Sequence, residues 1–289
     1  EVDLGTGNAY NPEDALRLYF QTGSVVGRSY TQDGEFNNAR VPIQQLTASS
    51  GANKMQMLIQ NYNHYLAYFQ AYTNTYSDIE SLKKMYQEAL KVPNIIGLVI
   101  GTRPDCISDE IINYLDELSK TYFISLEFGV ESTNEKTLLN VNRCHTFEET
   151  KATFEKCKNK GFHLGAHIII GLPGESKKEL LNHAFEISKL PIDTLKLHHL
   201  QIVKNSVMAV QYKRNPENFN LFSSEEYIDF ISDFIGYLRP DIIIERFISE
   251  APHSLLIAPK WNKLKNFEVV DKIDKKLTEK NMWQGKFYN

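Results

Sequence analysis

Five apolar runs of this 289-residue sequence each lead into a short polar or glycine-containing stretch. The stretches are 71–75, 101–105, 128–132, 171–175 and the adjacent pair His198 and His199. They supply hydroxyls, carboxylates, a guanidinium and imidazoles, which bind polar ligands, and glycines that let a ligand approach the backbone closely. If one scaffold brings these stretches together, they form a single ligand site.

The apolar runs themselves are predicted strands, and helical patterns lie between them. The expected strands are 65–72, 95–101, 123–129, 164–171 and 194–203, and the expected helices are 77–90, 108–120, 134–139, 147–160 and 177–190. Ser77 and Ser108 are the expected N-caps of two of these helices. The alternation predicts βα units and a parallel sheet, and the nearly continuous apolar runs predict strands buried on both faces. In such folds, ligands bind at the carboxyl ends of the strands, where the five stretches lie.

The sequence divides into three regions. Region 1–62 is rich in Gly, Asn, Gln, Ser and Thr, and we assign it no fold. Region 63–215 carries the βα pattern, and region 216–289 is an expected α/β extension. Its expected elements are a helix at 224–238, a strand at 242–247 and a helix at 269–280.

Composition excludes several classes of protein. A formal net charge of -4 gives no overall basic field, so nucleic-acid binding would need a local patch. The lysine-rich stretches 156–160 and 260–276 are more simply solvated helix faces. No apolar run approaches the roughly 18 residues of a membrane span, so we expect no membrane partner and a cytoplasmic location. Three cysteines, Cys106, Cys144 and Cys157, suit a reducing compartment and lack a metal-binding spacing.

Ordered motifs carry a family resemblance. They are 65–76, 101–106, 126–132, Asn142-Arg143 with His145-Thr146, 165–175, 196–200, 250–252, 258–261 and 283–285. Together they resemble the radical S-adenosylmethionine (SAM) proteins of the YhcC type, which are related to the radical SAM domain of the elongator catalytic subunit. The resemblance implies an α/β fold, a partial (β/α)6 parallel barrel of the radical SAM type whose C-terminal extension closes the barrel.

The resemblance also implies cofactors and a reaction. SAM would bind across the barrel mouth above a 4Fe–4S cluster, which would cleave SAM reductively to a 5'-deoxyadenosyl radical that acts on an unknown substrate. The kinship with elongator makes RNA a candidate partner. Such chemistry belongs to the cofactors, which the protein positions.

The resemblance further implies SAM-binding residues at the first strand ends. Tyr72, Thr73 and Asn74 would hold the methionine amine, although a plain strand-to-helix turn is the alternative. At the next strand end, Gly101 and Thr102 would lie close to the ligand. Arg103 would either pair with a carboxylate or stabilise its loop.

Three further candidate SAM-binding residues follow the expected strand 123–129. Glu131, Ser132 and Arg143 would contact the ribose or methionyl portions of SAM, with a salt bridge between Glu131 and Arg143 as the structural alternative.

The last strand ends complete the expected SAM site. Ile170 and Gly171 would lie against adenine, with core packing as the rival role for Ile170. His198 and Leu200 are the candidates on the final strand. A strand would point His198 and His199 to opposite faces, so at most one faces the site, and a hydrogen-bonded core role is the simpler reading for either.

The cluster ligands are the departure from the family pattern. The family uses three closely spaced cysteines near the N-terminus, because iron–sulfur clusters are held by thiolates. This sequence has no cysteine before Cys106. Two explanations are open: region 1–62 replaces the natural cluster region, which we favour, or the protein is a cluster-free SAM-binding or RNA-associated module. A barrel aldolase or isomerase ranks last, because Lys196 lies within a strand and Glu131 lacks an acidic partner.

Overall fold

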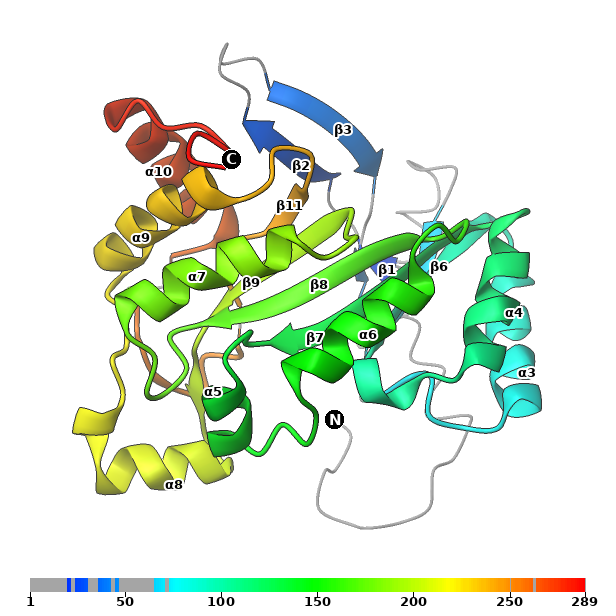
Figure 1. Cartoon of the computed structure of the whole chain (residues 1–289), viewed down its shortest axis with the longest axis horizontal. Coiled ribbons are helices and arrows are strands. Elements are labelled where there is room, and N and C mark those ends of the chain that lie inside the picture. The colour runs from blue at the N-terminus through cyan, green and yellow to red at the C-terminus, as the bar shows by residue number, and fades with distance from the viewer. Residues whose placement is uncertain are drawn as a thin grey trace.

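A curled half-barrel of six parallel strands forms the centre of the molecule (Figure 1). The computed structural model describes residues 65–70, 73–249, 251–261 and 264–288, together with the backbone of four strands between residues 20 and 46. The parallel strands are β5 (Tyr65–Phe69), β6 (Ile95–Thr102), β7 (Phe123–Glu131), β8 (His163–Ile170), β9 (Thr194–His199) and β11 (Ile243–Arg246). They lie side by side in that order, which is the partial barrel expected from the sequence.

Two antiparallel strands extend the sheet beyond β11. These are β2 (Ser24–Tyr30) and β3 (Phe36–Pro42), and β2 pairs with β11. The smaller pairings join β1 (Phe20–Gln21) to β4 (Gln45–Leu46) and β10 (Ile202–Val203) to β12 (Leu256–Ala258). Part of region 1–62 therefore belongs to the main sheet, although the sequence alone gave it no place.

Helices cover the outer face of the sheet (Figure 1). They are α3 (Ile79–Leu90), α4 (Asp109–Ser119), α6 (Phe147–Cys157), α7 (Lys177–Ser188), α9 (Ser224–Tyr237) and α10 (Asn266–Glu279). The short helices α5 (Glu135–Asn140) and α8 (Val207–Arg214) lie beyond the strand ends (Figure 1). Two single 3-10 turns, η2 (Pro104–Cys106) and η3 (Pro216–Asn218), lie in the connections. The expected N-cap Ser108 accepts a hydrogen bond from the Ile111 amide, whereas α3 is capped by the Asp78 carboxylate in place of Ser77.

Strand alternation separates an apolar outer face from a polar inner face. On β7, Leu126, Phe128 and Val130 are fully buried in the main core, which the outer helices share. Glu127 and Gly129 take the alternate positions between them. These positions face the inside of the half-barrel. The concave side of the sheet is therefore available for chemistry, while the convex side supplies the burial that stabilises the fold.

The C-terminal extension completes the half-barrel. Strand β11 pairs in parallel with β9, and α9 packs its buried residues Tyr227, Phe230 and Phe234 into the main core. Helix α10 adds Val269, Ile273 and Leu277 to the same core.

Among the helices of the described ranges, none is long and apolar enough to cross a membrane.

Candidate ligand site at the strand ends

The ends of β5 and β6 are tied together by hydrogen bonds. The Asn74 amide group donates to the carbonyls of Phe69, at 2.9 Å, and Gly101, at 2.8 Å. The buried hydroxyls of Thr75 and Thr102 lie 2.6 Å apart. Asn74 and Thr102 thus fix the shape of this edge. Thr73 precedes Asn74 in the connection after β5. Tyr72 lies outside the described residues.

Arg103 stabilises the loop that follows β6. Its guanidinium forms two hydrogen bonds with the Asp105 carboxylate, at 2.9 and 2.5 Å. Burial acts against ionisation of Asp105, but the hydrogen bond and charge of Arg103 still hold the pKa of Asp105 below its ordinary value. Of the two roles expected for Arg103, carboxylate pairing and loop stabilisation, the structure combines both within the protein itself.

The end of β7 carries the pair favoured for SAM. Glu131 adopts a left-handed backbone conformation with φ 66°, which turns its side chain back over the sheet. Arg143 lies 3.3 Å from the Glu131 carboxylate and donates to the Gly129 carbonyl at 2.6 Å. A β-carbon at Gly129 would lie 2.6 Å from both side chains, so both fold over this glycine. Glu131 and Arg143 therefore do form the salt bridge considered as the alternative.

Arg143 nevertheless keeps an unused donor. Its Nε atom is buried and has no hydrogen-bond partner among the described residues. A buried unpaired donor is costly, because it has lost its water without gaining a partner. The atom is therefore placed to donate to a group that the described residues do not supply.

Ser132 turns away from the strand-end edge. Its buried hydroxyl donates to the Glu175 carboxylate at 2.6 Å, and Glu175 lies 3.2 Å from His183 of α7. The other nitrogen of the His183 ring lies 2.7 Å from the Thr133 hydroxyl. Ser132 thus connects the end of β7 to the loop after β8. The structure gives it a positioning contact, and its expected contact with SAM stays a prediction.

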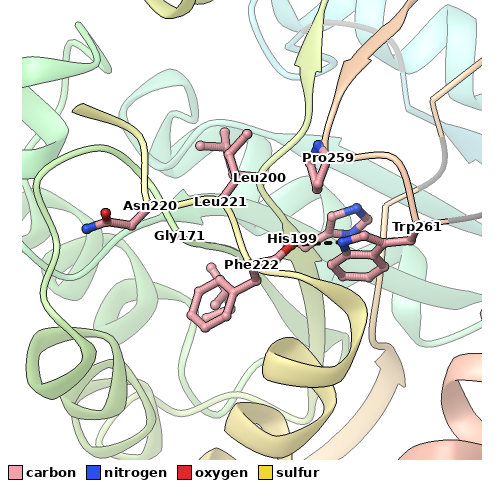
Figure 2. Close-up of a pocket in the computed structure, with 9 residues that line it drawn as sticks. Gly171, His199, Leu200, Asn220, Leu221, Phe222, Pro259 and Trp261 are labelled. Atoms are coloured by element: carbon pink, nitrogen blue, oxygen red, sulfur yellow. Dashed lines mark hydrogen bonds between the residues drawn. The ribbon is translucent and has the colours of Figure 1, made fainter. Parts of the chain in front are cut away.

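The ends of β8 and β9 meet beneath the C-terminal extension (Figure 2). Gly171 has φ 94°, a conformation that favours glycine, and a small pocket there is lined by Gly171, His199, Leu200, Phe222 and Trp261, among others. Trp261 donates to the Phe222 carbonyl at 2.9 Å and stacks on His199 with 3.9 Å between ring centroids.

Ile170 has a place in the core next to this pocket. Its side chain is fully buried, while its carbonyl accepts from the Leu200 amide at 2.9 Å. The adenine contact expected of Ile170 stays a prediction.

The two adjacent histidines face opposite ways, as the strand pattern indicated: His199 packs on Trp261, and His198 lies toward His167 with 5.5 Å between ring centroids.

His199 makes the stability of the protein depend on pH. Burial lowers the pKa of His199 to about 4, so the folded state excludes a proton that the unfolded chain accepts below its ordinary value of about 6.5. Stability is therefore fully present above about pH 6.5 and falls as the pH drops toward 4. We expect His199→Phe, which keeps an aromatic ring on Trp261, to reduce the loss of unfolding free energy between pH 7 and pH 5 by about 2 kcal/mol.

Urea denaturation at the two pH values measures this difference. His163→Gln is the matched control, because the His163 side chain is half exposed and its replacement should leave the pH dependence as it is. An equal loss of unfolding free energy between pH 7 and pH 5 in wild type and His199→Phe would contradict the lowered pKa of His199.

A buried charged network occupies the inner wall of the half-barrel. Glu127 of β7 lies at its centre, 2.5 Å from the Lys196 ammonium of β9. It also accepts from the Tyr68 hydroxyl of β5 at 2.8 Å and lies 2.9 Å from His167 Nε2 of β8. Lys196 approaches Glu245 of β11 at 3.3 Å as well. Side chains from five strands therefore meet on one surface.

The network fixes the charges of its members. Burial alone would raise the pKa of Glu127, but Lys196 and His167 hold it well below its ordinary value, so the carboxylate is ionised. Burial would likewise lower the pKa of Lys196, yet the carboxylate of Glu127 raises it above the ordinary value. A lysine held as an ammonium is no nucleophile, which argues against the aldolase alternative.

Sequence reasoning left this network unassembled. It placed Lys196 within a strand but did not predict which side chains lie across from it. The available signal was register: each charged or imidazole side chain interrupts an apolar strand at an inward position. Parallel pairing places Glu127 opposite Gly165 and His167 opposite Lys196.

The three cysteines do not fit an iron–sulfur cluster. Cys106 belongs to η2, Cys144 is exposed in the loop before α6, and Cys157 is buried in α6. Burial raises the pKa of the Cys106 thiol and raises that of Cys157 to about 12, so neither favours the thiolate that iron requires. Within the described ranges, no group of three cysteine, histidine or acidic side chains could hold a metal ion.

Comparison with known proteins assigns the family. The sequence model of the radical SAM superfamily matches residues 27–187, and that of the radical SAM C-terminal domain matches residues 192–279. The chain belongs to the radical SAM superfamily. Membership implies SAM and a 4Fe–4S cluster as cofactors.

The relatives of this radical SAM chain include uncharacterised proteins. It is 32% identical to YtqA of Bacillus subtilis over 78% of this chain and 69% of YtqA. It is 36% identical to YhcC of Escherichia coli over 71% of this chain, and the match spans 66% of YhcC. The solved structure of Methanocaldococcus infernus Elp3 lacking residues 1–46 has a TM-score of 0.66 at 20% identity, covering 81% of this chain and 58% of Elp3. The last likeness supports the half-barrel fold.

Proposed function

We propose that the strand-end edge binds SAM, and that the chain is the SAM-binding half-barrel of a radical SAM enzyme of the YhcC type with an unidentified substrate. The observation that carries the proposal is the buried Nε of Arg143, which lacks a partner among the described residues and is set beside the Glu131 carboxylate at the end of β7. A guanidinium and a carboxylate side by side match a ligand that carries a carboxylate, an amine and hydroxyl groups. SAM carries all three.

Each residue has a defined task in this proposal. Arg143 donates from Nε to the methionyl carboxylate, and Glu131 accepts from the ribose hydroxyls or the amine. Gly171 leaves room for the adenine side of the ligand, and Asn74 holds the β5 and β6 ends at a fixed spacing. When bound, SAM supplies the sulfonium-linked adenosyl group that this superfamily uses as its radical source. The cysteines present do not fit a cluster, so the proposed tasks are confined to binding SAM.

The misfit of the cysteines favours a second candidate, a SAM-binding module without radical chemistry. RNA as a partner belongs to either proposal. It is supported by a 26% identical relative, the tRNA uridine(34) acetyltransferase of Methanocaldococcus jannaschii, of which the alignment spans 33%.

Titration calorimetry of the purified chain with SAM tests the binding proposal. We expect saturable heat and competition by S-adenosylhomocysteine, and absence of both would overturn it. Iron and sulfide analysis after anaerobic reconstitution of the protein as its gene encodes it then separates the two candidates. About four of each per chain supports the radical enzyme, and a colourless protein that binds SAM supports the cluster-free module.

A further inference from the structure

The inner-wall network determines which nitrogen of His167 carries a proton. Glu127 is ionised, and its Oε2 atom already accepts from the Tyr68 hydroxyl. A carboxylate can only accept, so the His167 Nε2 atom, 2.9 Å from the same oxygen, must be the donor. In its neutral form His167 therefore has its lone pair on Nδ1. This is the arrangement in which a carboxylate orients an imidazole and stabilises it once it is protonated.

The free nitrogen of His167 can be reached by a ligand. Nδ1 has no hydrogen-bond partner among the described residues, and about 20% of the side chain is exposed. The other members are less accessible: Glu127 and Lys196 are 2% and 8% exposed. They hold the ring in place, and His167 presents the network to the inside of the half-barrel.

His167 also lies next to the proposed SAM site. It pairs in register with Gly129, the glycine over which Glu131 and Arg143 fold. The partly buried His198 ring lies on its other side, and burial together with His167 lowers the pKa of His198, which keeps that ring neutral. A ligand against this wall would meet two imidazoles below the Glu131 and Arg143 pair.

We propose that His167 Nδ1 is the proton acceptor for a hydroxyl- or amine-bearing substrate bound against the inner wall. The inference deepens the proposed function and rests on it, since it places the substrate beside SAM. In the step, the O–H or N–H bond of the substrate breaks, its electron pair stays on the substrate, and the proton moves to Nδ1. The resulting imidazolium is paired with the Glu127 carboxylate, and no electron donor or acceptor is needed.

Two measurements test this assignment. Long-range proton–nitrogen NMR of ¹⁵N-histidine-labelled protein, with His167 assigned from His167→Gln, should show the Nε2–H tautomer. The preference should weaken in Glu127→Gln and persist in Tyr68→Phe, the control that keeps the carboxylate. Diethyl pyrocarbonate, mapped by mass spectrometry, should modify His167, with exposed His163 as the reacting control and buried His199 as the protected one.

An Nδ1–H tautomer in the wild type, or a His167 that stays unmodified while His163 reacts, would overturn the proposal. These readouts do not involve SAM, so they separate two failures. If calorimetry detects SAM binding but the tautomer is wrong, the inference fails and the proposed function stands. If SAM does not bind, the proposed function fails, and the inference loses the ligand beside which it places the substrate.

Discussion

Replacing Arg143 with lysine is expected to weaken SAM binding by about ten- to hundredfold. Lysine keeps the positive charge but loses the planar fork that contacts the Gly129 carbonyl and the Glu131 carboxylate, and it loses the Nε donor proposed for the methionyl carboxylate. A hydrogen bond to a charged group contributes about 1.5–3 kcal/mol, and each 1.4 kcal/mol changes affinity about tenfold. Calorimetry with SAM measures the change directly.

Arg214→Lys is the matched control for this substitution. Arg214 is exposed at the end of α8 and forms no ion pair within the part of the chain that the structure describes, so the same exchange there should leave SAM affinity unchanged. Thermal unfolding of both variants shows whether the fold is retained. Wild-type affinity in a folded Arg143→Lys protein would remove Arg143 from the SAM site.

Lys196→Met is expected to lower the free energy of unfolding by about 3–5 kcal/mol, because it leaves the buried Glu127 carboxylate without its closest counter-charge. Adding Glu127→Gln should restore part of the loss, since the double variant no longer buries Glu127 as an unpaired charge, while Glu245 still lacks its contact with Lys196. The pKa of Glu127 is held below its ordinary value, so this stabilisation is present above the ordinary carboxyl pKa and is lost as the pH falls below it.

Urea denaturation of the single and double variants measures the coupling between the two side chains. Lys275→Met is the matched control: Lys275 pairs with Asp271 on an exposed face of α10, where loss of an ion pair costs about 0–1 kcal/mol. If Lys196→Met lowers the free energy of unfolding as little as Lys275→Met does, the inner-wall network contributes little to stability.

Local patterns predicted the βα core well. The strands at 95–102, 123–131 and 163–170 and the helices between them follow from apolar periodicity and turn residues, and Ser108 caps its helix as expected. Helix α8 and the strands β2 and β3 were not predicted. Val207 and Val210 of α8 are exposed, so that helix lacks the apolar stripe that periodicity detects.

The candidate site was predicted in its residues but not in its geometry. The resemblance named Glu131 and Arg143, yet the left-handed turn at Glu131 and the unpaired Nε of Arg143 depend on the fold around Gly129. The inner-wall network was missed because its ion pairs join strands 69 residues apart in sequence, from Glu127 to Lys196. Periodicity predicts the face of the sheet on which a side chain lies. It does not predict which side chains of other strands lie next to it.

Gly129 limits how the protein could change its ligand preference through mutation. Any side chain at this position would strike both Glu131 and Arg143. One substitution would therefore disturb both members of the proposed SAM-binding pair together. Variants with altered specificity are more accessible through the loops around the half-barrel, where replacing one residue leaves the rest of the site undisturbed.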